Sequence, residues 1–232
     1  MMNDEQRPKA TVVLAMSADG KIADAWRSPA RFGSAMDKSH LETQIAQADG
    51  VLFGAATLRA YGTTLTVTNP GLLQQRRQQH KPPQPVHIVC SESGQLNPDY
   101  RFFQQHVSRW LLTSLAGAAV WRDRPEFQQV MIAFEASGKV DWQTVFQQLS
   151  LTGLNKIVVT GGGMLVASLL AADCIDDLWL TICPLILGGG QAPSPVEGCG
   201  FPASIAPRLT LLSAQAIDQE VFLHYSLQRD KN

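Results

Sequence analysis

The fold is decided by residues 156–190, which read KIVVTGGGMLVASLLAADCIDDLWLTICPLILGGG. The apolar residues 157–159 are typical of a buried strand, and the glycines at 161–163 follow it almost directly. Residues 164–172 then predict a helix, and residues 178–183 predict a second buried strand. The stretch therefore predicts a strand, a glycine turn, a helix and a further strand, in that order.

The glycine triplet, Gly161, Gly162 and Gly163, has two interpretations. Glycine lets the backbone approach a ligand closely, and the first N–H groups of a helix point at that ligand, so a phosphate or another anion suits this turn. The alternative is a tight turn without a ligand. A Rossmann fingerprint would need a third glycine where the chain has Val166, and a phosphate-loop motif is absent as well. On these residues alone, both interpretations stay open.

Composition limits the class of protein. The 232 residues are 45% hydrophobic and 17% charged, which is typical of a globular chain, and we expect one domain over residues 1–232. Nineteen basic and 20 acidic side chains argue against a dedicated nucleic-acid binder. An apolar run of the roughly 18 residues that a membrane span needs is missing, and the acidic N-terminus does not resemble a signal peptide. We therefore expect a cytoplasmic protein that binds neither nucleic acid nor membranes.

Four cysteines form no C-x-x-C pair, so we predict no metal site. We expect residues 1–10 to be disordered and residues 191–207 to form a long loop, because the latter are rich in proline and glycine.

Apolar runs alternate with helical patterns along most of the chain. The other predicted strands cover residues 11–16, 51–53, 86–90, 109–113, 130–134, 208–214 and 220–227. Helices are predicted over 35–48, after Thr57, within 69–85 and after Asp141. The last two strands have no helix between them, which indicates an antiparallel pair. The prediction is a three-layer α/β domain, with a mixed, mostly parallel sheet and antiparallel C-terminal strands.

Four predicted strands end in glycine, serine or threonine. These strand ends are residues 17–21, 54–57, 91–94 and 160–163. Ligands bind outside the carboxyl ends of strands in open α/β sheets, so parallel strands would bring all four ends to one rim. Thr57 is predicted to cap a short helix with Arg59 in its first turn, where a cation opposes the helix dipole. A ligand anion would explain Arg59, and plain solvent exposure is the alternative.

The usual machinery for a protein nucleophile is missing from the sequence. It contains no G-x-S-x-G elbow, no H-E-x-x-H helix and no cysteine–histidine signature. We therefore expect a cofactor to carry the chemistry, while the protein supplies orientation and a proton donor.

Three segments resemble the RibD C-terminal family, the pyrimidine reductases of riboflavin biosynthesis. Residues 15–23 (AMSADGKIA) resemble its A-M-S-x-D-G-K-I-A opening, and residues 48–57 (ADGVLFGAAT) resemble a strand that ends in G-a-x-T. Residues 160–163 and 172–188 resemble its GG…D-e-l…P…G segment. The resemblance implies a dihydrofolate-reductase-like fold, usually as a homodimer. It also implies that NADPH reduces the ribosylamino group of a pyrimidine phosphate to a ribitylamino group.

Individual roles follow from the resemblance and the strand ends. Asp19 and Lys21 are expected beside the hydride-transfer site, and Ser34 and Thr160 on the substrate side. NADPH contacts are expected at Ala15, Gly54, Thr57, Arg59, Ser91, Gly161, Gly162, Gly163, Met164 and Leu165. Arg59 is the candidate partner of the 2′-phosphate.

The chain departs from the family on the substrate side. Bacterial members carry arginine where this chain has Ile45 and Thr68, an acidic residue at Thr160, and D-D-P at residues 61–63. Alkyl and hydroxyl groups cannot replace the bidentate phosphate bonds of arginine, which contribute about 1.5–3 kcal/mol each.

Two hypotheses therefore remain. The first is an NADPH-dependent reductase of a C=N or C=O bond, with 5-amino-6-(5-phosphoribosylamino)uracil as the favoured substrate and a pterin-like or imine compound as the alternative. The second is a non-catalytic nucleotide-binding module.

Overall fold

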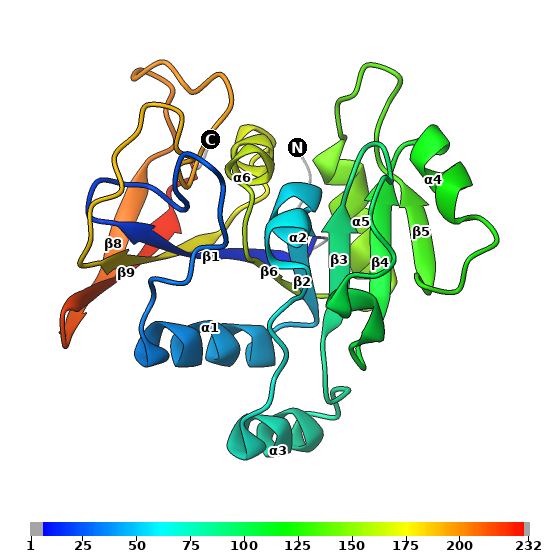
Figure 1. The fold of residues 1–232 in the computed structure, drawn as a ribbon, viewed down its shortest axis with the longest axis horizontal. Helices are drawn as coiled ribbons and strands as arrows, with labels where there is room; N and C mark the ends of the chain where they lie inside the picture. Colours follow the sequence, from blue (N-terminus) through cyan, green and yellow to red (C-terminus); the bar gives the residue numbers. More distant parts are fainter. Residues whose placement is uncertain (1–6, 230–232) are drawn as a thin grey trace.

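A computed structural model describes residues 7–229, which contain one nine-stranded sheet (Figure 1). The strands are β1 (Lys9–Ser17), β2 (Gly50–Gly54), β3 (Val86–Cys90), β4 (Arg109–Thr113), β5 (Gln129–Ile132), β6 (Lys156–Val159), β7 (Asp177–Cys183), β8 (Leu209–Ile217) and β9 (Glu220–Leu227). Their spatial order is β5-β4-β3-β2-β6-β1-β7-β9-β8. All neighbours from β5 to β7 pair in parallel, whereas β9 and β8 add an antiparallel end. The predicted fold class is confirmed.

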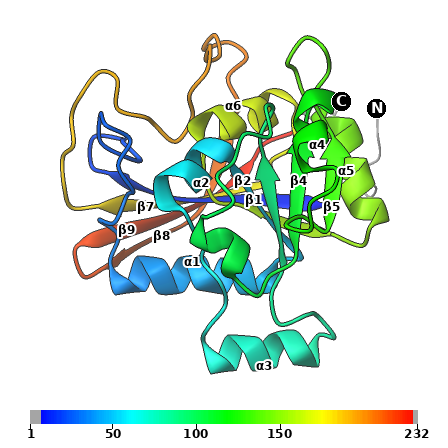
Figure 2. The ribbon, with the colours of Figure 1, turned by 45° about the vertical axis from the view of Figure 1, so that its right-hand side comes forward.

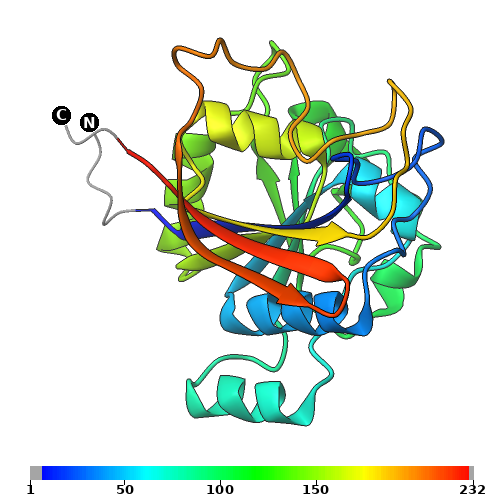
Figure 3. The same cartoon turned by 90° about the vertical axis from the view of Figure 1, so that its left-hand side faces the viewer.

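Helices cover both faces of the sheet. They are α1 (Ala35–Gln47), α2 (Ala55–Tyr61), α3 (Pro70–Gln78), α4 (Leu115–Trp121), α5 (Trp142–Leu151) and α6 (Gly163–Ala171), with a 3-10 turn, η2, at Arg101–Gln104. Figures 2 and 3 show α6 on one face and α1 on the other, with α3 outside α1. Alternate residues of β1 serve the two layers, because Val12 joins the core under α5 and α6 while Val13 joins the core under α1 and α2.

The helix after Asp141 forms as its sequence predicts. The Asp141 carboxylate accepts a hydrogen bond from the Thr144 N–H and caps α5. Trp142, Val145, Phe146 and Leu149 are buried against the sheet. Burial of each such side chain contributes about 1.5–3 kcal/mol, so this stripe fixes α5 on its face of the sheet.

Two local predictions are wrong. Thr57 does not cap α2, because the helix begins at Ala55 and Gly54 is its N-cap, without a side-chain hydrogen bond. Arg59 consequently lies in the last turn of α2, where the helix dipole favours a cation and no ligand anion is needed to explain it. Helix α4 was not predicted at all; Ser114 caps it by accepting a hydrogen bond from the Gly117 N–H.

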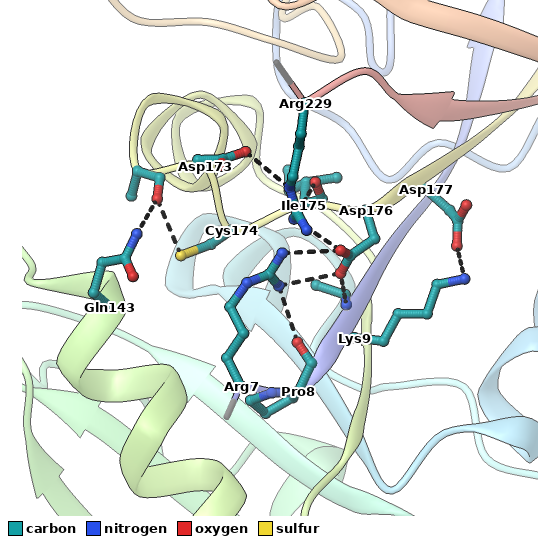
Figure 4. Close-up of polar contacts among 12 residues, drawn as sticks. Arg7, Pro8, Lys9, Gln143, Asp173, Cys174, Ile175, Asp176, Asp177 and Arg229 are labelled. Atoms are coloured by element: carbon teal, nitrogen blue, oxygen red, sulfur yellow. Dashed lines mark hydrogen bonds and ion pairs between the residues drawn. The ribbon is translucent and has the colours of Figure 1, made fainter. Parts of the chain in front are cut away.

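Arg7 and the first strand are held to Asp176 by ion pairs and a backbone hydrogen bond (Figure 4). Arg7 donates guanidinium hydrogen bonds to both carboxylate oxygens of Asp176, at 3.1 and 2.9 Å, and the Ala10 N–H donates to the same carboxylate at 2.7 Å. Arg229, beyond β9, reaches it at 2.8 Å. The expected disorder is therefore wrong for residues 7–10, and residues 1–6 lie outside those described.

The long connection before β8 contains no helix or strand over residues 184–208, which includes the loop expected at 191–207. Within residues 7–229, none of the helices combines the length and the apolar character that a membrane crossing needs.

Candidate active site

The four glycine- and hydroxyl-rich strand ends meet at one edge of the sheet. They follow β3, β2, β6 and β1, which are adjacent in this order and run in parallel. Their carboxyl ends therefore lie at the same edge (Figure 1), as the sequence predicted.

Two cavities open at this edge, and Gly162 lines both. The first, which we call the α1 cavity, measures about 610 Å³ and lies between α1 and the ends of β1 and β6. The second, the α6 cavity, measures about 890 Å³ and lies between α2, α6 and the end of β3. The α1 cavity is lined by the predicted residues Ala15, Ser34, Thr57, Thr160, Gly161 and Gly162. The α6 cavity is lined by Gly54, Arg59, Ser91, Gly162, Met164 and Leu165.

The backbone between the cavities requires glycine. Gly161 has φ +146° and Gly162 has φ +92°, in the region that side-chain-bearing residues rarely adopt. A Cβ on Gly161 would lie 3.1 Å from the Thr57 hydroxyl oxygen, which is tighter than ordinary contact. The turn therefore exposes bare backbone to both cavities, as the ligand interpretation of the triplet predicts.

Gly163 serves a different purpose. It lines neither cavity, and a Cβ there would collide with the carbonyl oxygen of Ser194. The Glu197 N–H also donates to the Gly163 carbonyl at 3.1 Å. Glycine at this position packs the long connection before β8 against the start of α6, and a cofactor contact at Gly163 stays a prediction.

Asp19 and Lys21 line neither cavity. The Asp19 carboxylate accepts hydrogen bonds from the Ser17 hydroxyl at 2.6 Å and from the N–H groups of Leu187 and Gly188 at 3.1 and 2.7 Å. These bonds, the Ser17 bond first, lower the pKa of Asp19 to about 2. Asp19 is thus ionised at neutral pH and fixes the turn at residues 187–188. The catalytic roles of Asp19 and Lys21 stay predictions.

Sequence reasoning missed a carboxyl group in the α1 cavity. Ser34 caps α1 by accepting hydrogen bonds from the Met36 and Asp37 N–H groups, and the Asp37 side chain lines the cavity. Burial raises the pKa of Asp37, with the nearby Glu220 adding to the shift and the Thr181 hydroxyl opposing it. The pattern S-x-x-D from Ser34 to Asp37 places Asp37 in a first turn, but it does not reveal a cavity.

Cations line both cavities. Arg31 and Lys38 line the α1 cavity, and Lys139 joins Arg59 in the α6 cavity; all four side chains are exposed. The spacing of these residues in the sequence gives no signal for their convergence, since the cations of each cavity come from separate segments.

Ile45 and Thr68, which stand where bacterial family members carry arginine, have different surroundings. Ile45 lines the α1 cavity with 1% of its surface exposed, so this wall is alkyl. Thr68 does not line it, and its N–H and hydroxyl donate to Glu42 at 2.5 and 3.1 Å. The Ile45 substitution therefore changes the cavity directly.

The fold and the site define an α/β protein with two adjoining cavities at the carboxyl edge of a parallel sheet, where such folds bind their ligands. The chain belongs to the RibD C-terminal domain family, which it matches over residues 8–223.

Its relatives include a pyrimidinone phosphate reductase and a riboflavin biosynthesis protein. The 2,5-diamino-6-ribosylamino-4(3H)-pyrimidinone 5′-phosphate reductase of Archaeoglobus fulgidus is 26% identical over 196 residues, which is 84% of this chain and 89% of that protein. The riboflavin biosynthesis protein RibD of Escherichia coli is 27% identical over 225 residues, 94% of this chain but 59% of that protein. A solved pyrimidine reductase-like protein from Corynebacterium diphtheriae shares the fold, with a TM-score of 0.81 at 20% identity, over 97% of this chain and 94% of its own.

Proposed function

We propose that this protein is an NADPH-dependent reductase of the 5-amino-6-(5-phosphoribosylamino)uracil reductase type, which acts in riboflavin biosynthesis. The observation that carries the proposal is the pair of cavities that meet at Gly162 in a member of the RibD C-terminal domain family. One cavity would hold the cofactor and the other the substrate, so that the two reacting carbons meet at the glycine turn.

The residues around the α6 cavity fit a dinucleotide. Gly162 offers bare backbone at one end, and the cavity volume of about 890 Å³ lies in the range of cofactor sites. Arg59 and Lys139 supply positive charge for the 2′-phosphate that distinguishes NADPH from NADH. When bound, the cofactor would supply a hydride, and the residues around the α6 cavity would hold it.

The α1 cavity suits a flat ring with a charged substituent. Leu41, Ile45 and Phe53 supply apolar walls for the ring. Arg31 and Lys38 are exposed cations on the same cavity and can reach a phosphate at its mouth. Because Asp19 is ionised, we expect water to supply the proton that accompanies hydride transfer.

Two measurements test this function in sequence. Titration with NADPH, followed by cofactor fluorescence, should show binding, and the absence of binding at millimolar NADPH would remove the proposal. Addition of the pyrimidine phosphate should then oxidise NADPH, which is followed as the loss of nicotinamide absorbance.

Ile45 and Thr160, both on the α1 cavity, favour a second candidate, a reductase of a pterin-like or imine substrate. NADPH oxidation with such a compound, but not with the pyrimidine phosphate, would identify it. Tight NADPH binding without oxidation by either class would instead favour a non-catalytic nucleotide-binding module.

We also propose that the protein forms a homodimer. Strand β8 is outermost in the sheet and exposes Leu209, Leu211 and Leu212 by 39, 53 and 52% of their surfaces. Exposed apolar edge strands favour association, because their outer backbone groups have no strand to pair with and their apolar side chains face solvent. Light scattering after size-exclusion chromatography should give twice the chain mass of 25.3 kDa, and a monomer would contradict this proposal.

A further inference from the structure

Glu92 is the single carboxyl group among the residues that line the α6 cavity in the described part of the chain. Its backbone is held in place, because its carbonyl accepts hydrogen bonds from the Ser114 N–H at 3.1 Å and from the Thr113 hydroxyl at 3.0 Å. Its carboxylate lies beside Gly138, where a Cβ would be 3.1 Å from Glu92 Oε1. The side chain therefore lies between the end of β3 and the turn before α5.

Two cations border the same part of the α6 cavity. Lys139 follows Gly138 directly, and the Arg59 guanidinium donates to the carbonyl of Gln95, three residues beyond Glu92, at 3.5 Å. All three charged side chains are exposed, and the ion pairs formed within residues 7–229 include none of them. A carboxylate and two cations are thus available to one ligand.

The sheet sets the distance between Glu92 and the junction of the two cavities. Glu92 follows β3 and Gly162 follows β6, with β2 between these two strands. Neighbouring strands lie about 4.8 Å apart, so the two strand ends are separated by roughly 10 Å across the sheet. A dinucleotide with its nicotinamide at Gly162 would therefore place its adenosine half near Glu92.

The two nicotinamide cofactors differ at the adenosine ribose. NADH carries a 2′-hydroxyl there, and a carboxylate accepts hydrogen bonds from ribose hydroxyls. NADPH carries a 2′-phosphate instead, which a carboxylate repels and which arginine and lysine attract. Dinucleotide sites commonly hold either an acidic residue for the hydroxyl or an arginine for the phosphate, and this cavity has both kinds of charge.

We propose that Glu92 determines cofactor specificity: it binds the ribose hydroxyls of NADH and opposes the attraction of Arg59 and Lys139 for the 2′-phosphate, so that the protein uses NADH as well as NADPH. This inference rests on the proposed reductase function. It keeps NADPH as a cofactor and adds NADH as a second one.

The first test measures the Kd for NADPH and for NADH by fluorescence titration. We expect the two values to lie within about tenfold of one another in the wild-type protein. Glu92→Gln should strengthen NADPH binding by roughly three- to tenfold and weaken NADH binding by a similar factor, because it removes one negative charge and keeps the side-chain shape. Glu92 is exposed, so Tm should stay unchanged and confirm that the variant folds.

Glu135→Gln is the matched control. Glu135 is an exposed carboxylate in the turn that contains Gly138, and it does not line the α6 cavity. Its substitution changes the net charge of the chain by the same amount. At about 0.1 M salt, screening weakens the effect of a charge outside the cavity, so the ratio of the two Kd values should stay that of the wild type.

The second test uses the adenosine half of each cofactor alone. Calorimetric titration compares adenosine 2′,5′-bisphosphate with adenosine 5′-phosphate, which differ only in the 2′-phosphate. Glu92→Gln should bind the bisphosphate more tightly and the monophosphate more weakly than the wild type does. This measurement requires neither a nicotinamide ring nor turnover of a substrate.

The outcomes separate the two proposals. An unchanged ratio of the two Kd values in Glu92→Gln, or a wild-type preference for NADPH above about hundredfold, overturns the role of Glu92 and leaves the reductase function standing. An equal change in Glu135→Gln also overturns it, since the effect would then arise from net charge. Failure of both cofactors to bind overturns the reductase function instead.

Discussion

Replacing Gly162 with alanine tests whether the junction of the two cavities holds the cofactor. Gly162 has φ +92°, so a side chain there strains the backbone by about 1–3 kcal/mol. The methyl group itself has room, since its nearest neighbours would be the Leu165 Cβ at 3.6 Å and the Gly54 Cα at 3.8 Å. For a chain of this size we therefore expect Tm to fall by roughly 2–12 °C without loss of the fold.

Gly162→Ala should weaken NADPH binding by more than the backbone strain alone predicts. The Gly162 backbone lines both cavities, so any shift that relieves the strain moves the surface that a dinucleotide would contact. We expect the Kd for NADPH to rise at least tenfold, which corresponds to about 1.4 kcal/mol. Fluorescence titration measures this Kd, and calorimetry measures Tm.

Gly153 provides the matched control. It has φ +87°, a Cβ there would meet no atom within 4 Å, and it lies in the turn between α5 and β6, outside both cavities. Gly153→Ala should lower Tm to a similar extent and leave NADPH binding unchanged. If Gly162→Ala lowered Tm in the same way but bound NADPH like the wild type, the cofactor would not contact this turn, and the assignment of the α6 cavity would fail.

Three further changes have distinct expected outcomes. Burial raises the pKa of Asp37 above its ordinary 3.8, so the charged form of this side chain destabilises the fold above that pH. Asp37→Asn should therefore raise Tm at pH 7, and the gain should vanish below about pH 4. A fall in Tm at pH 7 would indicate a structural role for the carboxylate instead. Arg59→Ala should weaken NADPH binding but not NADH binding in parallel titrations, and equal losses would exclude contact with the 2′-phosphate. Arg76 is 1% exposed and donates to three backbone carbonyls at 2.7–2.8 Å, so Arg76→Ala should cost roughly 3 kcal/mol or more in a denaturant titration. Its exposed neighbour Arg77 is the control, since Arg77→Ala should change stability by less than about 0.5 kcal/mol.

The backbone of the site could be predicted because its signals are local. A strand that ends in a glycine triplet specifies its own turn, and parallel strands bring all such turns to one edge. The apolar stripe from Trp142 to Leu149 likewise fixes its helix from sequence spacing alone. These features depend on neighbours along the chain, so one sequence was sufficient.

The side chains of the site could not be predicted in the same way. Asp37 faces a cavity because α1 packs on the sheet at one rotation, which its cap does not specify. Arg59 was placed in the wrong turn because Thr57 resembles a cap, although the small residues Gly54 and Ala55 already begin α2. Asp19 and Lys21 cluster in sequence, yet the Asp19 carboxylate is engaged with the turn at residues 187–188, a partner about 170 positions away. Such contacts depend on tertiary packing.

One stripe of α1 lines the α1 cavity, and this gives a further prediction. Asp37, Leu41 and Ile45 follow at four-residue spacing, all line the α1 cavity, and extend over about 12 Å of helix. With an alkyl group at Ile45, the end of the stripe opposite the carboxylate carries no cation. The cations that line the cavity, Arg31 and Lys38, are exposed, and exposed ion pairs contribute only about 0–1 kcal/mol each.

Recognition in this chain should therefore depend more on the ring than on the phosphate. We expect removal of the 5′-phosphate from the pyrimidine substrate to lower kcat/KM by about thirtyfold at most, because two exposed ion pairs together contribute no more than about 2 kcal/mol. The two compounds can be compared in one NADPH oxidation assay, and raising the salt concentration should weaken the phosphate contribution further, because it screens exposed charges. A larger loss on phosphate removal would show that Arg31 and Lys38 hold the substrate and that the carboxylate on α1 is secondary.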